Sequence, residues 1–236
     1  MTIDLTNQSV LVLGAGGGIG EATAQAFATG GAQVIAAGRQ GPKLQSRAAT
    51  IGADAAILDF LDNEAVEAFF AARPPFDHVV IAAASTKSGP VGGLSLADAQ
   101  ASMDSKFWGA YRVARAARVC DGGSITFVSG FLSKRPSPSS VLQGAINAAL
   151  EALARGLALE RAPVRVNTVS PGLIDTPLHA KMSAADRQAM FDRTAARLPA
   201  RRVGQPEDIA QAILFVATNP FATGSTVTVD GGGTIA

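Results

Sequence analysis

The stretch Leu-Gly-Ala-Gly-Gly-Gly-Ile-Gly, residues 13–20, decides the fold of this chain. It follows a short apolar run at residues 9–13 and opens an Ala-rich run with helical periodicity at residues 19–28. Glycines let the backbone turn tightly and approach a phosphate, and the start of a helix offers free N–H groups and a positive dipole end. In this context the stretch predicts a dinucleotide-binding turn. Its residues are Gly14, Gly16, Gly17, Gly18, Ile19 and Gly20.

Short β-branched runs alternate with longer Ala- and Leu-rich stretches along the whole chain. The pattern predicts strands at residues 9–13, 33–37, 53–58, 78–82, 124–129, 165–169 and 226–229. It predicts helices at residues 19–28, 63–72, 96–119, 141–161 and 206–218. This alternation indicates an α/β protein, a Rossmann-type three-layer α/β/α sandwich with a seven-stranded, mainly parallel, doubly wound sheet. We expect one domain, residues 1–236, with the least regular stretch, residues 171–198, as a substrate lid.

Composition excludes several classes of protein. The 20 Lys and Arg residues nearly balance the 19 Asp and Glu residues, which argues against binding to nucleic acid or to an anionic membrane. One cysteine and two histidines provide neither a disulfide framework nor a metal-ligand cluster. The chain shows no signal peptide and no apolar run long enough to span a bilayer, so a soluble cytoplasmic protein is expected.

The glycine spacing is G-x-x-x-G-x-G, because the alternative G-x-G-x-x-G frame would place Ile19 last. This variant resembles the short-chain dehydrogenase/reductase family, and further similar motifs cover essentially the whole chain. They are Asp59-Phe60, the run from Asn167 to Thr176, the run at 202–210 and the run at 224–232. The resemblance implies a homodimer or homotetramer that packs through the helices at 96–119 and 141–161.

The resemblance also implies cofactor contacts. Asp59 and Phe60 would lie at the adenine, and Pro171-Gly172 beside the nicotinamide. Ile174 would offer backbone groups to the carboxamide and Thr176 a hydroxyl to phosphate. The family's Asn-Asn-Ala-Gly tract at the end of the fourth strand has become Ile81 followed by three alanines, which would still line the cofactor: Ala82, Ala83 and Ala84.

The residues after the second strand indicate which dinucleotide is bound. An NAD site usually places an acid about 20 residues after the glycine turn, on the ribose 2′-hydroxyl. Gly38 stands at that position and Arg39 follows it, so Arg39 could bind a 2′-phosphate and stack on adenine. The sequence therefore favours NADP(H) over NAD(H). The alternative is a solvated Arg39, and a second basic position of many NADP-preferring relatives is Gly17 here.

The family's catalytic pattern is broken at all four positions. The run after Asn147 matches the family and fixes the register, which places Gln143 at the tyrosine position and Asn147 at the lysine position. The serine position is Gly130, one residue after Ser129, and Lys106 stands where asparagine is expected. Gln143 cannot ionise, so it cannot act as a general acid or base.

Lysine and asparagine have nevertheless exchanged places, at Lys106 and Asn147. If the two helices pack as in the family, an Asn/Lys pair still lines the site, and the Lys106 ammonium could donate to a substrate oxygen or to the ribose. The alternative is that Lys106 extends from a surface helix into solvent. The candidate catalytic residues are Lys106, Ser129, Gln143 and Asn147.

Three functions remain open. The first is an NADP(H)-dependent oxidoreductase acting on an unknown carbonyl or alcohol through an atypical active site. The second is a non-catalytic nucleotide-binding sensor or scaffold that kept the fold and lost the chemistry. The third is a different reaction, such as hydration or isomerisation, in which bound nucleotide has a structural role.

Overall fold

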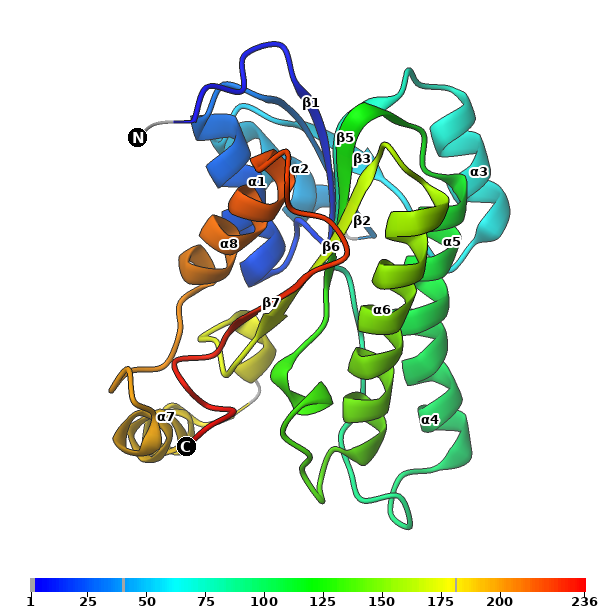
Figure 1. Ribbon diagram of the computed structural model, residues 1–236. Coiled ribbons are helices and arrows are strands. Elements are labelled where there is room, and N and C mark those ends of the chain that lie inside the picture. Colours follow the sequence, from blue (N-terminus) through cyan, green and yellow to red (C-terminus); the bar gives the residue numbers. More distant parts are fainter. Residues whose placement is uncertain (1–2, 40, 181) are drawn as a thin grey trace.

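The computed structural model describes residues 3–39, 41–180 and 182–236. Seven strands form one sheet in the order β3-β2-β1-β4-β5-β6-β7, and every neighbouring pair is parallel. The sheet twists through the centre of the molecule (Figure 1). The strands are β1 (Ser9–Leu13), β2 (Gln33–Gly38), β3 (Asp54–Ile57), β4 (Phe76–Ile81), β5 (Val119–Val128), β6 (Arg165–Pro171) and β7 (Thr226–Val229).

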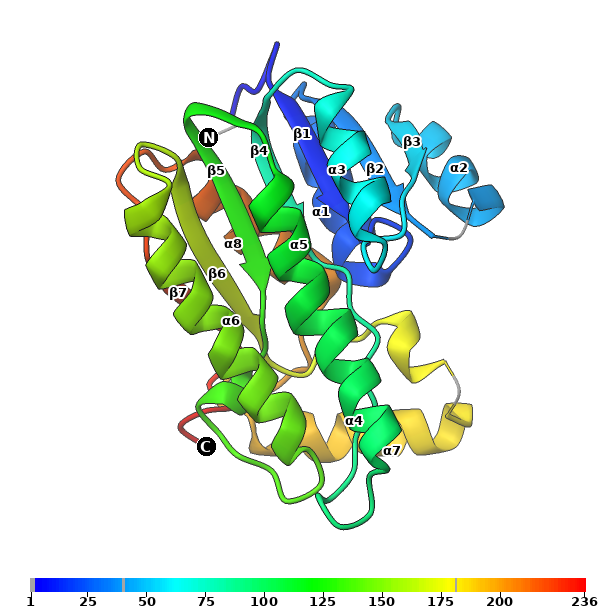
Figure 2. The same cartoon turned by 90° about the vertical axis from the view of Figure 1, so that its right-hand side faces the viewer.

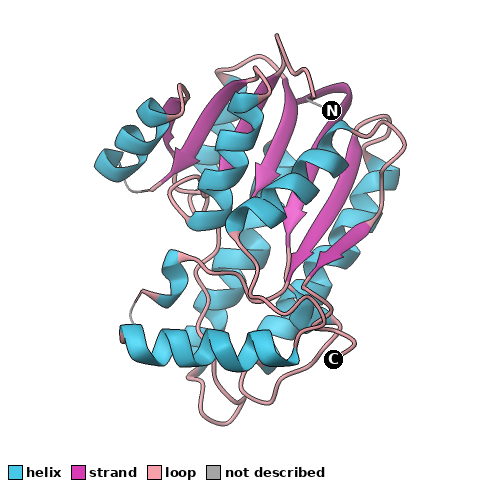
Figure 3. Ribbon diagram, turned by 90° about the vertical axis from the view of Figure 1, so that its left-hand side faces the viewer, coloured by secondary structure: helices cyan, strands magenta, loops and turns pink. Residues whose placement is uncertain are grey.

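Helices cover both faces of this sheet, which confirms the predicted doubly wound α/β sandwich. Figure 2 shows one face, with α3 (Asn63–Ala71), α5 (Gly109–Ala116) and α6 (Val141–Glu160) lying across the strands. Figure 3 shows the opposite face, where α1 (Gly18–Thr29) packs beside α8 (Pro206–Thr218). None of the helices in the described residues is long and apolar enough to cross a membrane.

Strand β1 explains how both faces are filled. Val10 and Val12 pack with Phe27 under α1 and α8, while Leu11 and Leu13 point the other way, into the core beneath α3, α5 and α6. Successive side chains alternate across a strand, so a strand buried on both faces must be apolar at every position. This is why the run before the glycine turn is continuously apolar.

The prediction of one continuous helix at 96–119 is wrong, because the helix is interrupted and ends earlier. The structure has α4 (Leu96–Met103), then a π-helical turn η1 (Asp104–Trp108), then α5, which ends at Ala116. Strand β5 starts at Val119 rather than residue 124, and its pairing with β4 shifts register near its start. The alanine-rich composition of residues 96–119 favours a helix. From Val119 onward the chain is a strand instead, because pairing with β4 overrides the local helix propensity.

Two helices were absent from the sequence-based assignment. Helix α2 (Gly41–Thr50) opens with Gly-Pro, which is typical of a turn, and helix α7 (Ala184–Arg197) has no buried residue among its fourteen. A helix with no buried face gives only a weak periodic signal. Helix α7 lies in the stretch 171–198 that was expected to be irregular, of which residue 181 is outside the described residues. It lies beyond the carboxyl ends of the strands (Figures 2 and 3).

Candidate active site

The glycine turn between β1 and α1 is packed too closely for side chains. Gly14 has a φ of +89°, a conformation that favours glycine, and a Cβ there would lie 2.7 Å from the Ala83 nitrogen. A Cβ on Gly20 would lie 2.2 Å from the Gly14 oxygen. The glycine turn therefore packs closely against the end of β4, and α1 begins directly after the turn.

A cleft of about 450 Å³ runs along this turn. A Cβ on Gly16 would meet no protein atom within 4 Å, so any side chain there would project into open space rather than into the core. The Arg39 guanidinium lies 5.7 Å from the centre of the Phe60 ring, which places a cation and an aromatic face side by side in the cleft. The lining residues are Gly14, Gly16, Gly17, Gly38, Arg39, Leu44, Phe60, Ala82, Ala83 and Ala84.

The remaining predicted cofactor residues surround this cleft less directly. Gly18 lets the segment at Thr176 approach the start of α1, since a Cβ there would lie 3.0 Å from the Thr176 methyl carbon. Ile174 is buried and forms an isolated parallel bridge with Gly204. Asp59 does not line the cleft, and its side chain accepts a hydrogen bond from the Leu61 amide at 3.0 Å. Two more residues, Pro171 and Gly172, lie at the end of β6, and Ile19 lies in the first turn of α1.

Three of the four predicted catalytic residues, Lys106, Ser129 and Asn147, meet at the end of β5. Lys106 Nζ donates to Asn147 Oδ1 at 2.6 Å and to the Ser129 carbonyl oxygen at 2.7 Å. Asn147 is 3 % exposed, so the contact is interior. Lys106 lies in the π-turn η1, a conformation that is frequent at functional sites because it re-aims side chains within a helix. The lysine therefore turns inward and does not extend into solvent.

A buried carboxylate, missed in the sequence, completes this centre. Glu151 lies one helical turn beyond Asn147 on α6 and accepts hydrogen bonds from the Ser129 hydroxyl at 3.0 Å and the Ser133 hydroxyl at 2.6 Å. Buried acids are rare unless they are partnered. Gln143, Asn147 and Glu151 follow one another at four-residue spacing, and this polar line on a mostly apolar helix was the available signal.

Two further contacts show how the altered positions fit together. Gln143 Nε2 donates to Thr86 Oγ1 at 3.0 Å, which ties α6 to the segment after β4. A Cβ on Gly130 would lie 2.8 Å from Asn147 Nδ2. Gly130 and Asn147 are thus sterically coupled, since the Asn147 amide occupies the space that a larger residue at 130 would need.

Burial lowers the pKa of Lys106 to about 8, and the negative charge of Glu151 opposes that shift. Near neutral pH the lysine is therefore mostly an ammonium group that can release a proton at modest cost. A lysine with this pKa can act as a proton donor or, once deprotonated, as a base. No other described residue in the cluster of Ser129, Gln143 and Asn147 has a side chain that ionises near neutral pH.

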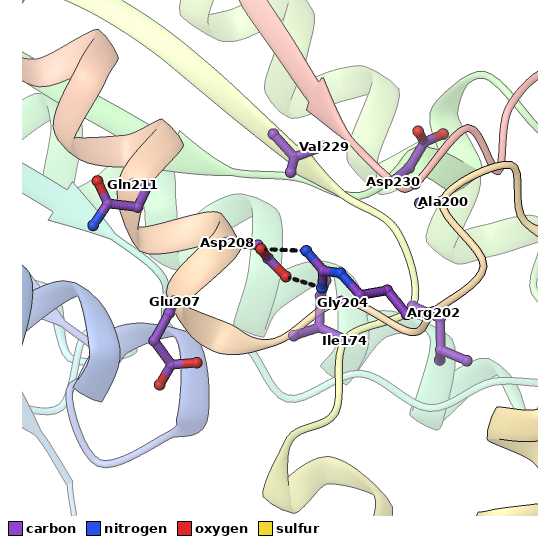
Figure 4. A pocket seen from close by; sticks show the side chains of 11 residues that line it. Ile174, Ala200, Arg202, Gly204, Glu207, Asp208, Gln211, Val229 and Asp230 are labelled. Carbon is purple, nitrogen blue, oxygen red and sulfur yellow. Dashed lines mark hydrogen bonds and ion pairs between the residues drawn. The ribbon is translucent and has the colours of Figure 1, made fainter. Parts of the chain in front are cut away.

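A separate pocket of about 390 Å³ lies between the loop after β6 and the start of α8. Figure 4 shows that the Arg202 guanidinium faces the Asp208 carboxylate there, with two hydrogen bonds of 2.6 and 2.7 Å. The charges of this pair neutralise each other. The pair links the loop before α8 to Asp208 in the first turn of that helix. The described residues contain no group of three His, Cys, Asp or Glu side chains placed to hold a metal ion.

Comparison with known proteins identifies the class. The family model described as "Enoyl-(Acyl carrier protein) reductase" matches residues 14–234. Galactitol 2-dehydrogenase (L-tagatose-forming) of Cereibacter sphaeroides is 32 % identical over 95 % of this chain and 94 % of its own length. The crystal structure of a small-chain dehydrogenase in complex with NADPH is 35 % identical, with a TM-score of 0.85 over 97 % of this chain and 99 % of that chain.

An NADPH-bound short-chain oxidoreductase from Pseudomonas aeruginosa PAO1, described as containing an atypical catalytic center, is 27 % identical. Its TM-score is 0.87, with 98 % of both chains covered. The fold and the cleft at the glycine turn thus define a Rossmann-type protein of dinucleotide-binding architecture. The chain belongs to the short-chain dehydrogenase/reductase family of oxidoreductases, as its resemblance to that family implied.

Proposed function

We propose that this protein is an NADP(H)-dependent oxidoreductase that interconverts a carbonyl compound and an alcohol with Lys106 in place of the family's tyrosine. The observation that carries the proposal is the position of the Lys106 ammonium, 2.6 Å from Asn147 and 2.7 Å from the Ser129 carbonyl. Carbonyl reduction requires a proton donor that polarises the carbonyl oxygen of the substrate. The Lys106 ammonium at the end of β5 is such a donor.

The residues of the cleft fit NADP(H). The open space at Gly16 allows a pyrophosphate to approach the backbone, and the start of α1 offers unpaired N–H groups to it. Arg39 would bind the 2′-phosphate and Phe60 would flank the adenine, while Ile174 and Thr176 would hold the nicotinamide end. When bound, NADPH would supply the hydride for reduction of the carbonyl carbon. The bound NADPH of two similar structures supports the choice of cofactor.

Lys106 would stabilise and protonate the substrate oxygen. An ammonium group has three N–H donors, of which Asn147 Oδ1 and the Ser129 oxygen accept two. The third is left for the substrate oxygen, which gains a proton as the carbonyl carbon gains a hydride. Asn147 and Ser129 hold the Lys106 ammonium in place, and the negative charge of Glu151 opposes the lowering of the Lys106 pKa by burial. Gln143, fixed by Thr86, would contribute only hydrogen bonding.

A non-catalytic NADP(H) sensor is the second candidate, and one observation favours it. Two of the three Lys106 donors are already bound to protein, and Gln143 is held by Thr86, so most of the hydrogen-bonding groups of the centre have protein partners without a substrate. In this case the Lys106–Asn147 contact would stabilise the packing of η1 on α6 and no hydride would be transferred.

The test is NADPH consumption with a panel of small ketones, aldehydes and sugars, followed by product analysis with deuterium-labelled NADPH. Deuterium in an alcohol product supports the oxidoreductase. Micromolar NADPH binding with no deuterium transferred to any member of the panel supports the sensor.

We also propose a homodimer or homotetramer built on α4, α5 and α6. Trp108 and Tyr111 pack edge to face at 5.6 Å and are 47 % and 40 % exposed. Exposed aromatic pairs of this kind are enriched at protein interfaces. Light scattering after size-exclusion chromatography measures the molar mass of the oligomer. Trp108→Ser should lower this mass toward that of the monomer.

A further inference from the structure

Arg47 reaches the glycine turn from a part of the chain that the cofactor motifs do not include. It lies in the last turn of α2, and its Nη1 donates to the Gly16 carbonyl oxygen at 2.6 Å. The same guanidinium nitrogen lies 2.7 Å from the carboxylate of Glu21, in the first turns of α1. Arg47 therefore joins α2 to the β1–α1 turn.

This bond places a second guanidinium beside Gly16, a residue that lines the cleft. Gly16 and Leu44 both line the cleft, and Leu44 precedes Arg47 by three residues, on the same face of α2. Arg39 lines the cleft from the end of β2. The side chain of Arg47 is 25 % exposed, so its charge is partly shielded from water while remaining reachable.

Two arginines approaching one cleft from different elements suit a group with two negative charges. A phosphate monoester carries nearly two charges at neutral pH and prefers several arginine donors. Adenosine alone offers no such charge. The only phosphate monoester on NADP(H) is the 2′-phosphate.

We propose that Arg47 is a second 2′-phosphate-binding residue and that Glu21 limits its strength, so that NADPH is preferred over NADH through both Arg39 and Arg47. This rests on the NADP(H) specificity proposed above. When the 2′-phosphate is present, the Arg47 guanidinium donates to it and keeps its bond to the Gly16 carbonyl. Glu21 competes with the phosphate for the same guanidinium, because both are anions.

The probes are adenosine 2′,5′-bisphosphate and adenosine 5′-monophosphate, titrated into the purified protein by calorimetry. They differ only in the 2′-phosphate and involve no hydride transfer. Arg47→Ala should weaken the bisphosphate roughly tenfold and the monophosphate less than about twofold, since one charge-assisted hydrogen bond is lost. Glu21→Gln keeps Arg47 and should tighten the bisphosphate roughly two- to fivefold.

Arg118→Ala is the matched control. It removes the same charge from an exposed position at the amino ends of β4 and β5, the end of the strands opposite to the cleft, where the guanidinium bonds only the Arg73 carbonyl among the described residues. It should leave both affinities unchanged. Arg47→Lys keeps a cation and should lose less than Arg47→Ala, which separates a loss of charge from a loss of folding.

Two results overturn the assignment of Arg47. One is equal weakening of both probes by Arg47→Ala, which would mean that Arg47 only shapes the glycine turn. The other is no weakening of either. If the unmodified protein shows no preference for the bisphosphate over the monophosphate, the proposed NADP(H) specificity fails instead, and the assignment of Arg47 fails with it. A preference that Arg39→Ala abolishes and Arg47→Ala leaves intact overturns the Arg47 assignment alone.

Discussion

The ammonium nitrogen of Lys106 lies 2.6 Å from the side-chain oxygen of Asn147, across the contact between the π-turn η1 and helix α6. The resemblance to the family predicts that these two positions exchange an asparagine and a lysine, and in the structure they contact each other directly. A cation and its amide acceptor thus lie together at the end of β5.

Replacing Lys106 with alanine should remove catalysis without removing cofactor binding. Loss of a general acid typically lowers turnover by roughly 10²- to 10⁴-fold, and we expect kcat to fall in that range while the Kd for NADPH stays within about twofold. Steady-state kinetics and fluorescence titration measure the two quantities. Lys134→Ala is the control, because the Lys134 ammonium bonds Thr228 Oγ1 instead. Unchanged turnover in Lys106→Ala would rule out the assigned role.

The pH profile of carbonyl reduction should report Lys106. Its ammonium form is the donor and its pKa lies at about 8, so the rate should be full below that pH and fall as pH rises through it. Glu151 raises the pKa of Lys106 by its negative charge. Glu151→Gln should therefore move the falling limb to lower pH, whereas Glu160→Gln, on the exposed end of α6, should leave it in place. A limb that stays fixed in Glu151→Gln would contradict this electrostatic link.

Replacing Gly130 with serine, the residue that the resemblance predicts there, should destabilise the protein. A Cβ there would lie 2.8 Å from Asn147 Nδ2, so Gly130→Ser must displace the amide that holds Lys106. We expect the free energy of unfolding to fall by about 1–3 kcal/mol, as for other overpacked sites. Denaturant titration measures it, and in an Asn147→Ala background the further loss caused by Gly130→Ser should be much smaller, because the clashing amide is gone.

Gly156→Ala on the same helix is the comparison, because a Cβ there meets no protein atom within 4 Å. It should raise stability by about 0.5–1 kcal/mol, the helix propensity difference. A Gly130→Ser protein as stable as the original would show that Asn147 can move freely, and the coupling of the two positions would be wrong.

Acid should destabilise the fold partly through His78. It is buried, with Ser124 Oγ at 2.8 Å and Gln8 Oε1 at 2.9 Å from its ring nitrogens, and burial lowers its pKa to about 4, with Arg165 adding to the shift and Asp77 opposing it. The unfolded chain binds this proton near pH 6.5, so stability is present above that pH and is lost as pH falls toward 4.

The shift corresponds to ~3 kcal/mol at most. Chemical denaturation at a series of pH values measures the loss, and His78→Gln should remove most of the slope between pH 6.5 and 4. His179→Gln, at the half-exposed histidine beside Phe191, should change it little. An unchanged slope in His78→Gln would contradict the assignment.

The strands and the glycine turn could be predicted from the sequence because their patterns are local. Continuously apolar strands such as Ser9–Leu13 and the glycine turn after them carry their signal in adjacent residues. Helix α7 carries little signal, because none of its residues is buried, and the break between α5 and β5 depends on pairing with a strand more than 40 residues earlier. These features needed tertiary structure.

The site shows the same division. Arg39 and the Lys106–Asn147 exchange are visible from their positions in the chain. The roles of Glu151, Thr86 and Arg47 are not, because each depends on a contact between residues far apart in sequence. The separation is 57 residues for Gln143 and Thr86, and 31 for Arg47 and Gly16. Side-chain direction across a helix pair cannot be deduced from spacing alone.

The most direct test of the central claim is equilibrium binding of NADPH and NADH, side by side, to the purified protein and to Arg39→Ala. The account predicts micromolar binding of NADPH, weaker binding of NADH, and a loss of NADPH affinity in Arg39→Ala of roughly tenfold or more. Failure of both nucleotides to bind the unmodified protein would contradict it, and the glycine turn would then be retained as architecture only.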